Sequence, residues 1–129
     1  MEDKRIKIKI TTISTGNPVS VIKEEGTFRS KDGKTLISCV DKEGVKTSFI
    51  ITDSGISLSR SSQMYSLKIP VRAEQITKGM MGDENTFEVI GKTVEFSCFS
   101  KGARVYLEYN LPDLSDTPMD FKVEAEIQF

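Results

Sequence analysis

Apolar and polar residues alternate at both ends of the chain. Ile6, Ile8 and Ile10 are separated by single basic residues. From Phe121 to Phe129 every second position is apolar, and the positions between them carry a charge or an amide. Successive side chains of an extended strand point to opposite faces, so this period of two predicts strands with one buried and one solvated face.

The rest of the chain is made of short segments rich in β-branched and aromatic residues, separated by turn-forming groups such as 31–34, Lys-Asp-Gly-Lys. Gly26 predicts a bend or bulge inside a strand. Residues 77–84 are the longest predicted loop and the place where any short helix is expected, and 112–118 form a second, proline-bounded loop. The further strands are predicted at 19–29, 36–40, 45–52, 56–60, 65–69, 71–76, 87–90, 93–99 and 104–111.

No window of helical length has apolar residues spaced by three and four. About nine or ten strands with turns every eight to twelve residues predict an all-β fold. We expect a single antiparallel up-and-down β-barrel of about eight to ten strands, with a two-sheet sandwich as the alternative. A chain of 129 residues has the size of one domain, so residues 1–129 are predicted to form one unit.

The net charge and composition do not identify a binding partner. The 18 basic and 19 acidic residues leave a net charge of -1, too little to attract nucleic acid or an anionic membrane surface. The basic row of Arg5, Lys7 and Lys9 is better explained as protection of a sheet edge against aggregation. Without an export signal or an apolar span, the protein is expected in the cytoplasm, where Cys39 and Cys98 would be free, buried thiols. A disulfide between them is the alternative.

The chain contains no histidine. This removes the commonest general base and the commonest metal ligand, so we expect no enzyme activity, no metal site and no cofactor. Carboxylate pairs such as Glu24 with Glu25, or Glu124 with Glu126, are more simply explained as solvated side chains. Neither cysteine has a histidine to activate it as a nucleophile.

Arg60 is the most informative polar residue, because it follows Ile56 and Leu58 at a period of two and would point to the apolar side of its strand. A buried guanidinium must be paired or hydrogen-bonded. Arg60 would therefore form a structural pair with an internal carboxylate, lie exposed at the strand end, or anchor an acidic ligand. The other polar residues in phase with apolar neighbours, each either a satisfied core group or a ligand contact, are Thr47, Tyr65, Gln75 and Tyr109.

Seven segments of the chain carry a resemblance to a known family: 6–10, 25–28, 45–51, 55–60, 62–65, 86–89 and 105–111. In these segments the chain resembles the YwiB-like family of small bacterial proteins, whose fold is a calycin-type barrel akin to lipocalins and fatty-acid-binding proteins. The resemblance implies a barrel, whose lumen can be open or filled, and brings no established ligand or activity. Residues 76–82 depart from the family, because they keep a glycine but lose the proline and aromatic residues of its usual turn.

Two functions follow from these expectations. The first is non-enzymatic binding of a small, partly apolar and acidic molecule in the barrel lumen. The second is an interaction module with a filled core, which uses a strand edge or the Met80-Met81 segment to contact a protein, including a second copy of this chain in a homodimer. An enzyme that uses carboxylates or tyrosine is a third and weaker hypothesis. The lining of the barrel interior distinguishes the first two.

Overall fold

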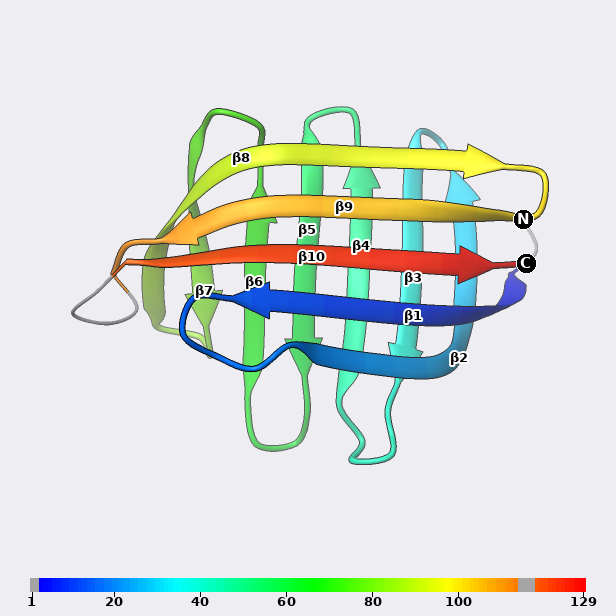
Figure 1. The fold of residues 1–129 in the computed structure, drawn as a ribbon, viewed down its shortest axis with the longest axis horizontal. Coiled ribbons are helices and arrows are strands. Elements are labelled where there is room, and N and C mark those ends of the chain that lie inside the picture. The colour runs from blue at the N-terminus through cyan, green and yellow to red at the C-terminus, as the bar shows by residue number, and fades with distance from the viewer. Residues whose placement is uncertain (1–2, 114–117) are drawn as a thin grey trace.

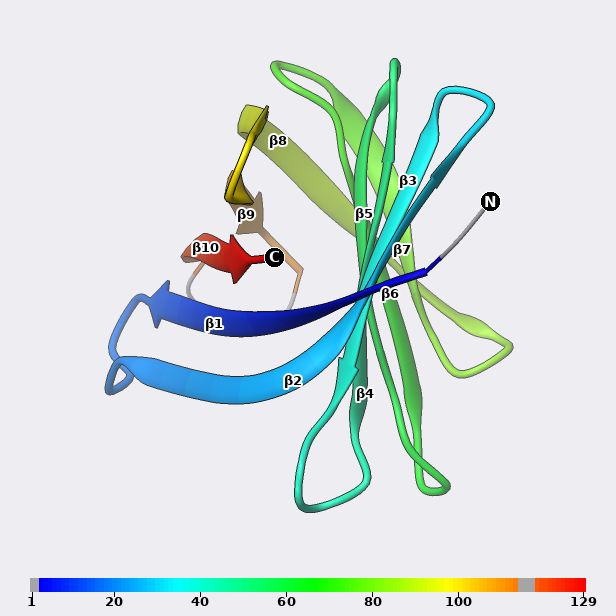
Figure 2. The ribbon, with the colours of Figure 1, turned by 90° about the vertical axis from the view of Figure 1, so that its right-hand side faces the viewer.

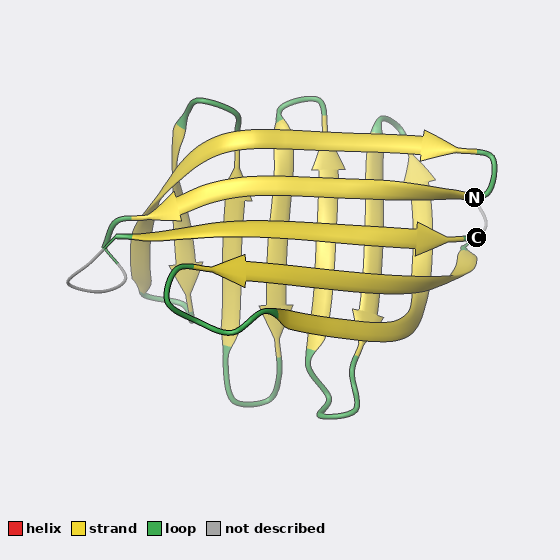
Figure 3. Cartoon of the chain, in the orientation of Figure 1, coloured by secondary structure: helices red, strands yellow, loops and turns green. Residues whose placement is uncertain are grey.

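The computed structural model describes residues 3–113 and 118–129. These residues form ten strands and no helix (Figure 3). No helix of the described residues can therefore span a membrane. The strands are β1 (Lys4–Ser14), β2 (Ser20–Lys31), β3 (Lys34–Val40), β4 (Lys46–Thr52), β5 (Gly55–Ser61), β6 (Ser66–Val71), β7 (Ile76–Met81), β8 (Asn85–Phe99), β9 (Gly102–Leu111) and β10 (Met119–Gln128).

The ten strands close into a ring in which each strand pairs with its neighbours in the sequence (Figure 1). All pairs are antiparallel, and β1 closes the ring by pairing with β2 on one side and β10 on the other. The prediction of an all-β, up-and-down barrel is confirmed. Strand β1 is paired on both sides, so its basic residues do not guard a free sheet edge.

The barrel is flattened into two layers whose strands cross at a steep angle. Strands β9, β10 and β1 lie in the front layer in Figure 1 and β3 to β7 lie in the back layer (Figure 2). Strands β2 and β8 bend from one layer to the other, and β8 pairs first with β7 and then with β9. Gly26 pairs with Ile6 on β1 and with Cys39 on β3. A Cβ atom at Gly26 would collide with the carbonyl oxygen of Ser38. The bend predicted at this position is therefore possible only because glycine has no side chain.

Strand β8 is one long strand where the sequence predicted two. A bulge between Gly91 and Thr93 shifts its pairing with β9 by one residue. The shift places Val89 on the interior side before the bulge and Val94 on that side after it. A Cβ atom at Gly91 would meet the backbone of Arg72, so this glycine allows the turn after β6 to pack against the strand.

The predicted loop at 77–84, with its short helix, is wrong. Residues 76–81 form β7, which pairs with β8 from Ile76 opposite Ile90 to Met81 opposite Asn85. Gly79, which the sequence places in that loop, lies inside β7 and serves packing, because a Cβ atom there would collide with the Phe87 ring. The predicted loop at 112–118 lies partly outside the described residues.

The alternation predicted for the clearest strands is confirmed. On β1 the residues Ile6, Ile8 and Ile10 are buried, and on β10 so are Val123, Ala125 and Ile127. The turn at 32–33 has positive φ angles of 53° and 76°, as a tight two-residue hairpin requires. Together the inward faces of all described strands except β7 form one apolar core.

Candidate functional site

The inward side chains of the back layer lie in rows of cross-strand neighbours. One row contains Cys39, Thr47 and Arg60, each one residue from the end of its strand, and we call it the polar row. The next inward row is wholly apolar, and we call it the apolar row. It contains Ile37, Phe49, Leu58 and Ile69 on β3 to β6.

The apolar row belongs to a filled centre. Ile37 and Phe49 expose 0% of their surface, and so do Val105 and Leu107 on the opposite layer. A side chain with no exposed surface touches neither solvent nor an internal space large enough for water. The middle of the barrel is therefore packed with side chains, as is usual for small barrels.

Arg60 lies at the partly open end of the same interior. Its strand neighbours are Thr47, which is 4% exposed, and Leu67, which is partly buried. The Nε atom of Arg60 is buried and has no hydrogen-bond partner. Leaving such a donor unpaired costs about 1–3 kcal/mol. Arg60 thus faces inward as its phase with Leu58 predicted, and it carries an unmet hydrogen-bonding group.

Two arginines on the outer surface, Arg29 and Arg104, are paired, unlike Arg60. Arg29 binds Asp3 with an Nε–Oδ1 distance of 2.6 Å, and Arg104 donates from Nε to Glu124 at 3.2 Å. The Arg29 guanidinium holds the pKa of the Asp3 carboxyl below its usual value. No carboxylate of residues 3–113 or 118–129 forms an ion pair with Arg60. The structural pair that the sequence left open is therefore absent from these residues.

Tyr109 faces the interior from β9, as predicted, and is 3% exposed. Its ring stacks on Phe121, with centroids 5.2 Å apart and planes 9° from parallel. Burial raises the pKa of the Tyr109 hydroxyl, and the Arg60 charge offsets part of the rise. Arg60 and Tyr109 are thus close enough to interact electrostatically, although they belong to opposite layers.

Two titratable groups at this end of the interior, Cys39 and Glu24, were not among the predicted site residues, although Cys39 was predicted to be buried. Burial raises the pKa of the Cys39 thiol to about 11, the charges of Glu24 and Asp41 add to the rise, and Arg60 opposes it. Glu24 pairs with the inward-facing Ile8 and is itself partly buried. Its phase with Ile22 and Phe28 along β2 was the signal that could have found it.

Two predicted site residues do not line the interior. Tyr65 lies in the turn before β6 and is 41% exposed, because that strand begins only at Ser66. Gln75 is exposed in the turn between β6 and β7, where its N–H donates to the Arg72 carbonyl at 3.2 Å. The prediction that 71–76 is one strand was wrong, because β6 ends at Val71 and β7 begins at Ile76. The prediction that Gln75 faces the interior depended on that strand and was also wrong.

The two cysteines are free, as predicted, but only Cys39 is buried. Cys98 is exposed near the end of β8. The two therefore differ in access to reagents, which makes Cys98 an internal reference for experiments on Cys39.

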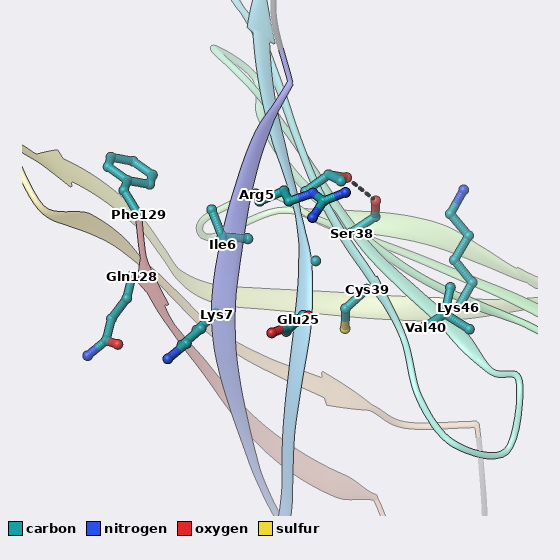
Figure 4. Close-up of a pocket in the computed structure, with 12 residues that line it drawn as sticks. Arg5, Ile6, Lys7, Glu25, Ser38, Cys39, Val40, Lys46, Gln128 and Phe129 are labelled. Carbon is teal, nitrogen blue, oxygen red and sulfur yellow. Dashed lines mark hydrogen bonds between the residues drawn. The ribbon is translucent and has the colours of Figure 1, made fainter.

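A hollow lies on the outside of the barrel, where β1 and β2 pass the ends of β3 and β4 (Figure 4). It is an open groove of about 770 Å³. Thr27 and Ser38 share a hydrogen bond of 3.1 Å across it, and the basic side chains at its rim are exposed. Solvated groups of this kind carry no unmet hydrogen bond. The groove is lined by Arg5, Ile6, Lys7, Glu25, Gly26, Thr27, Ser38, Cys39, Val40, Lys46, Gln128 and Phe129.

The chemistry available at the polar row is recognition of an anion. Arg60 offers a buried donor with a positive charge, and Thr47 and Tyr109 are polar groups near the same space. Among the residues that the structure describes, no three metal-ligating side chains come together. The Cys39 thiol, with a pKa of about 11, stays protonated at neutral pH and is a poor nucleophile.

Comparison with known proteins informs the fold alone. No family model and no curated protein matches the chain. The structure is similar to the crystal structure of the ywiB protein from Bacillus subtilis, with a TM-score of 0.75 and 14% sequence identity. The match covers 96% of this chain and 92% of the other. The chain thus has a YwiB-like fold. An identity this low gives no information about a ligand.

Proposed function

We propose that this protein is a non-enzymatic binding protein that takes a small, partly apolar carboxylate at the polar row. The observation that carries the proposal is the buried Nε of Arg60, which has neither a hydrogen-bond partner nor a described carboxylate as counterion. A carboxylate ligand would supply both, through a charge-assisted hydrogen bond worth about 1.5–3 kcal/mol.

The surroundings of Arg60 favour a ligand with an apolar part. Ile22, Leu67 and Phe121 face the interior, pack against the core and keep part of their surface open. Thr47 and Tyr109 add polar groups beside the guanidinium. Sites for small molecules usually combine apolar walls with a few placed polar groups in this way. Cytoplasmic location, absence of catalysis and a calycin-type ancestry are parts of the same proposal.

A thermal-shift experiment tests the proposal. Wild-type protein and Arg60→Met are melted with and without millimolar hexanoate, benzoate and, as an uncharged analogue, hexanamide. We expect the two carboxylates to raise the melting temperature of the wild type, and hexanamide to raise it less. Arg104→Met, which changes an outer arginine, should keep the wild-type response. An equal response in wild type and Arg60→Met would refute the proposed site.

The outer face of the back layer supports a second candidate, a homodimer. Six neighbouring outward positions on β3 to β5 carry no charge, whereas the outer faces of β1 and β10 are rich in Lys and Glu. Interface centres are depleted of charged residues. The filled middle of the barrel also fits an interaction module. The uncharged positions are Leu36, Ser38, Ser48, Ile50, Ser57 and Ser59.

Light scattering after size-exclusion chromatography tests the dimer. Wild-type protein should elute with twice the mass of one chain, and Ser59→Glu, which places a charge in the uncharged face, should elute as a monomer. Ser66→Glu, at the exposed start of β6, is the matched control and should remain a dimer. A monomeric wild type at all concentrations would exclude this candidate.

A further inference from the structure

We infer that the site at the polar row suits compact monocarboxylates, such as a short-chain or single-ring acid, gains no affinity from a long alkyl chain and disfavours dicarboxylates. This inference rests on the proposed function and adds the size and charge of the ligand. Two observations carry it independently. The filled centre of the barrel sets the size, and the position of Glu24 sets the charge.

The depth available beyond Arg60 is small. The apolar row follows the polar row by two residues along each strand, a distance of roughly 6.6 Å. At that depth Phe49 and Ile37 are 0% exposed, and Leu58 is 6% exposed. A carboxylate held at Arg60 therefore has no free interior above it into which an alkyl chain could run.

A long chain would have to displace the core. The facing layer is as tightly packed as the apolar row, since Val105 and Leu107 are 0% exposed and Val123 is 1% exposed. Forcing extra methylene groups into a packed core pushes side chains from their preferred rotamers. The apolar part of a ligand must instead lie at the open end of the barrel, against Ile22, Leu67 and the exposed part of Phe121.

Glu24 limits the charge of the ligand. Its carboxylate faces the interior from β2, and its charge reaches Cys39, as the charge of Arg60 does. A monoanion at Arg60 would leave one positive charge and three negative charges at this end, from the ligand, Glu24 and Asp41. A second carboxylate on the ligand would add repulsion that no described ion pair of Arg60 or Glu24 relieves.

Isothermal titration calorimetry with four acids tests the limit on ligand size and the limit on ligand charge separately. Wild-type protein is titrated with hexanoate, benzoate, palmitate below its critical micelle concentration, and adipate. We expect hexanoate and benzoate to bind, and Arg60→Met to weaken both roughly tenfold to a hundredfold. Palmitate should bind no more tightly than hexanoate, and adipate at least roughly tenfold more weakly. Glu24→Gln should strengthen the binding of all these acids and of adipate most, so that adipate comes closer to hexanoate.

Failure of this inference differs from failure of the proposed function. If palmitate binds tenfold more tightly than hexanoate and Arg60→Met abolishes both, the size limit is wrong and the site stands. If adipate equals hexanoate in the wild type, the charge limit is wrong. If none of the four acids binds, the proposed function is wrong, and the inference falls with it. Circular dichroism spectra of Arg60→Met and Glu24→Gln that match the wild type confirm that the variants are folded.

Discussion

Two neighbouring rows of the same sheet differ in what they do for the protein. The apolar row is dry and fills the middle of the barrel, whereas the polar row, two residues away along each strand, holds a thiol, a hydroxyl and an unpaired guanidinium. Packing alone does not explain a buried Arg60 Nε without a partner, because an apolar side chain would avoid that cost. The difference fits our proposal that the apolar row serves stability and the polar row serves recognition.

The largest expected effect on stability comes from truncating a side chain in the apolar row. Phe49→Ala should lower the free energy of unfolding by about 3–5 kcal/mol, because it leaves a cavity in a packed centre. Thr47→Ala, two residues earlier on β4 and in the polar row, should cost about 1 kcal/mol. Urea denaturation of the three proteins measures both values. Equal losses would remove the distinction between the rows.

The next effect is a pH dependence specific to the polar row. The Cys39 thiol has a pKa of about 11 in the folded protein and 9.0 as its reference value. Between these pH values the unfolded chain loses the proton while the folded chain keeps it, so stability present below pH 9 is lost as pH rises to 11. The loss amounts to about 2–3 kcal/mol.

Denaturation curves at several alkaline pH values check this prediction. Cys39→Ala should lack the component that the wild type loses, so the stability difference between the two proteins should shift in favour of the variant as pH rises. Cys98→Ala changes the exposed thiol and should follow the wild-type profile. A constant difference between wild type and Cys39→Ala would mean that Cys39 is not buried among these groups.

The smallest effect on stability should come from Arg60 itself. Arg60→Met removes an unpaired donor and leaves no described carboxylate without its partner, so the free energy of unfolding should change by less than about 1 kcal/mol or rise slightly. Glu24→Gln should be similarly neutral. Losses of about 3–5 kcal/mol in both variants would instead reveal a buried Arg60–Glu24 pair, the structural alternative that the sequence left open.

The sequence correctly predicted which side chains face the interior where apolar and polar residues alternate without interruption. It failed where a turn interrupts that alternation. Arg60, Thr47 and Tyr109 lie inside because their strands continue without interruption. Gln75 was misplaced because the turn at 72–75, where Glu74 has a φ of 59°, interrupts the pattern.

Strand β7 was missed for a different reason. Gly79 is typical of a loop when only the neighbouring sequence is considered, but in the fold it makes room for the Phe87 ring from the paired strand. The unpaired state of the Arg60 Nε likewise depends on contacts between distant segments, which no single-strand pattern contains.

Nuclear magnetic resonance gives the most direct test of the claim that Arg60 receives an anion. Proton–nitrogen correlation spectra of labelled protein resolve the arginine Nε–H groups, and a titration with hexanoate follows each one. We predict that one Nε–H resonance shifts strongly, that it is missing from the spectrum of Arg60→Met, and that those of the paired Arg29 and Arg104 stay in place. If no arginine Nε–H resonance shifts, or if the shifting one persists in Arg60→Met, the polar row is not the binding site.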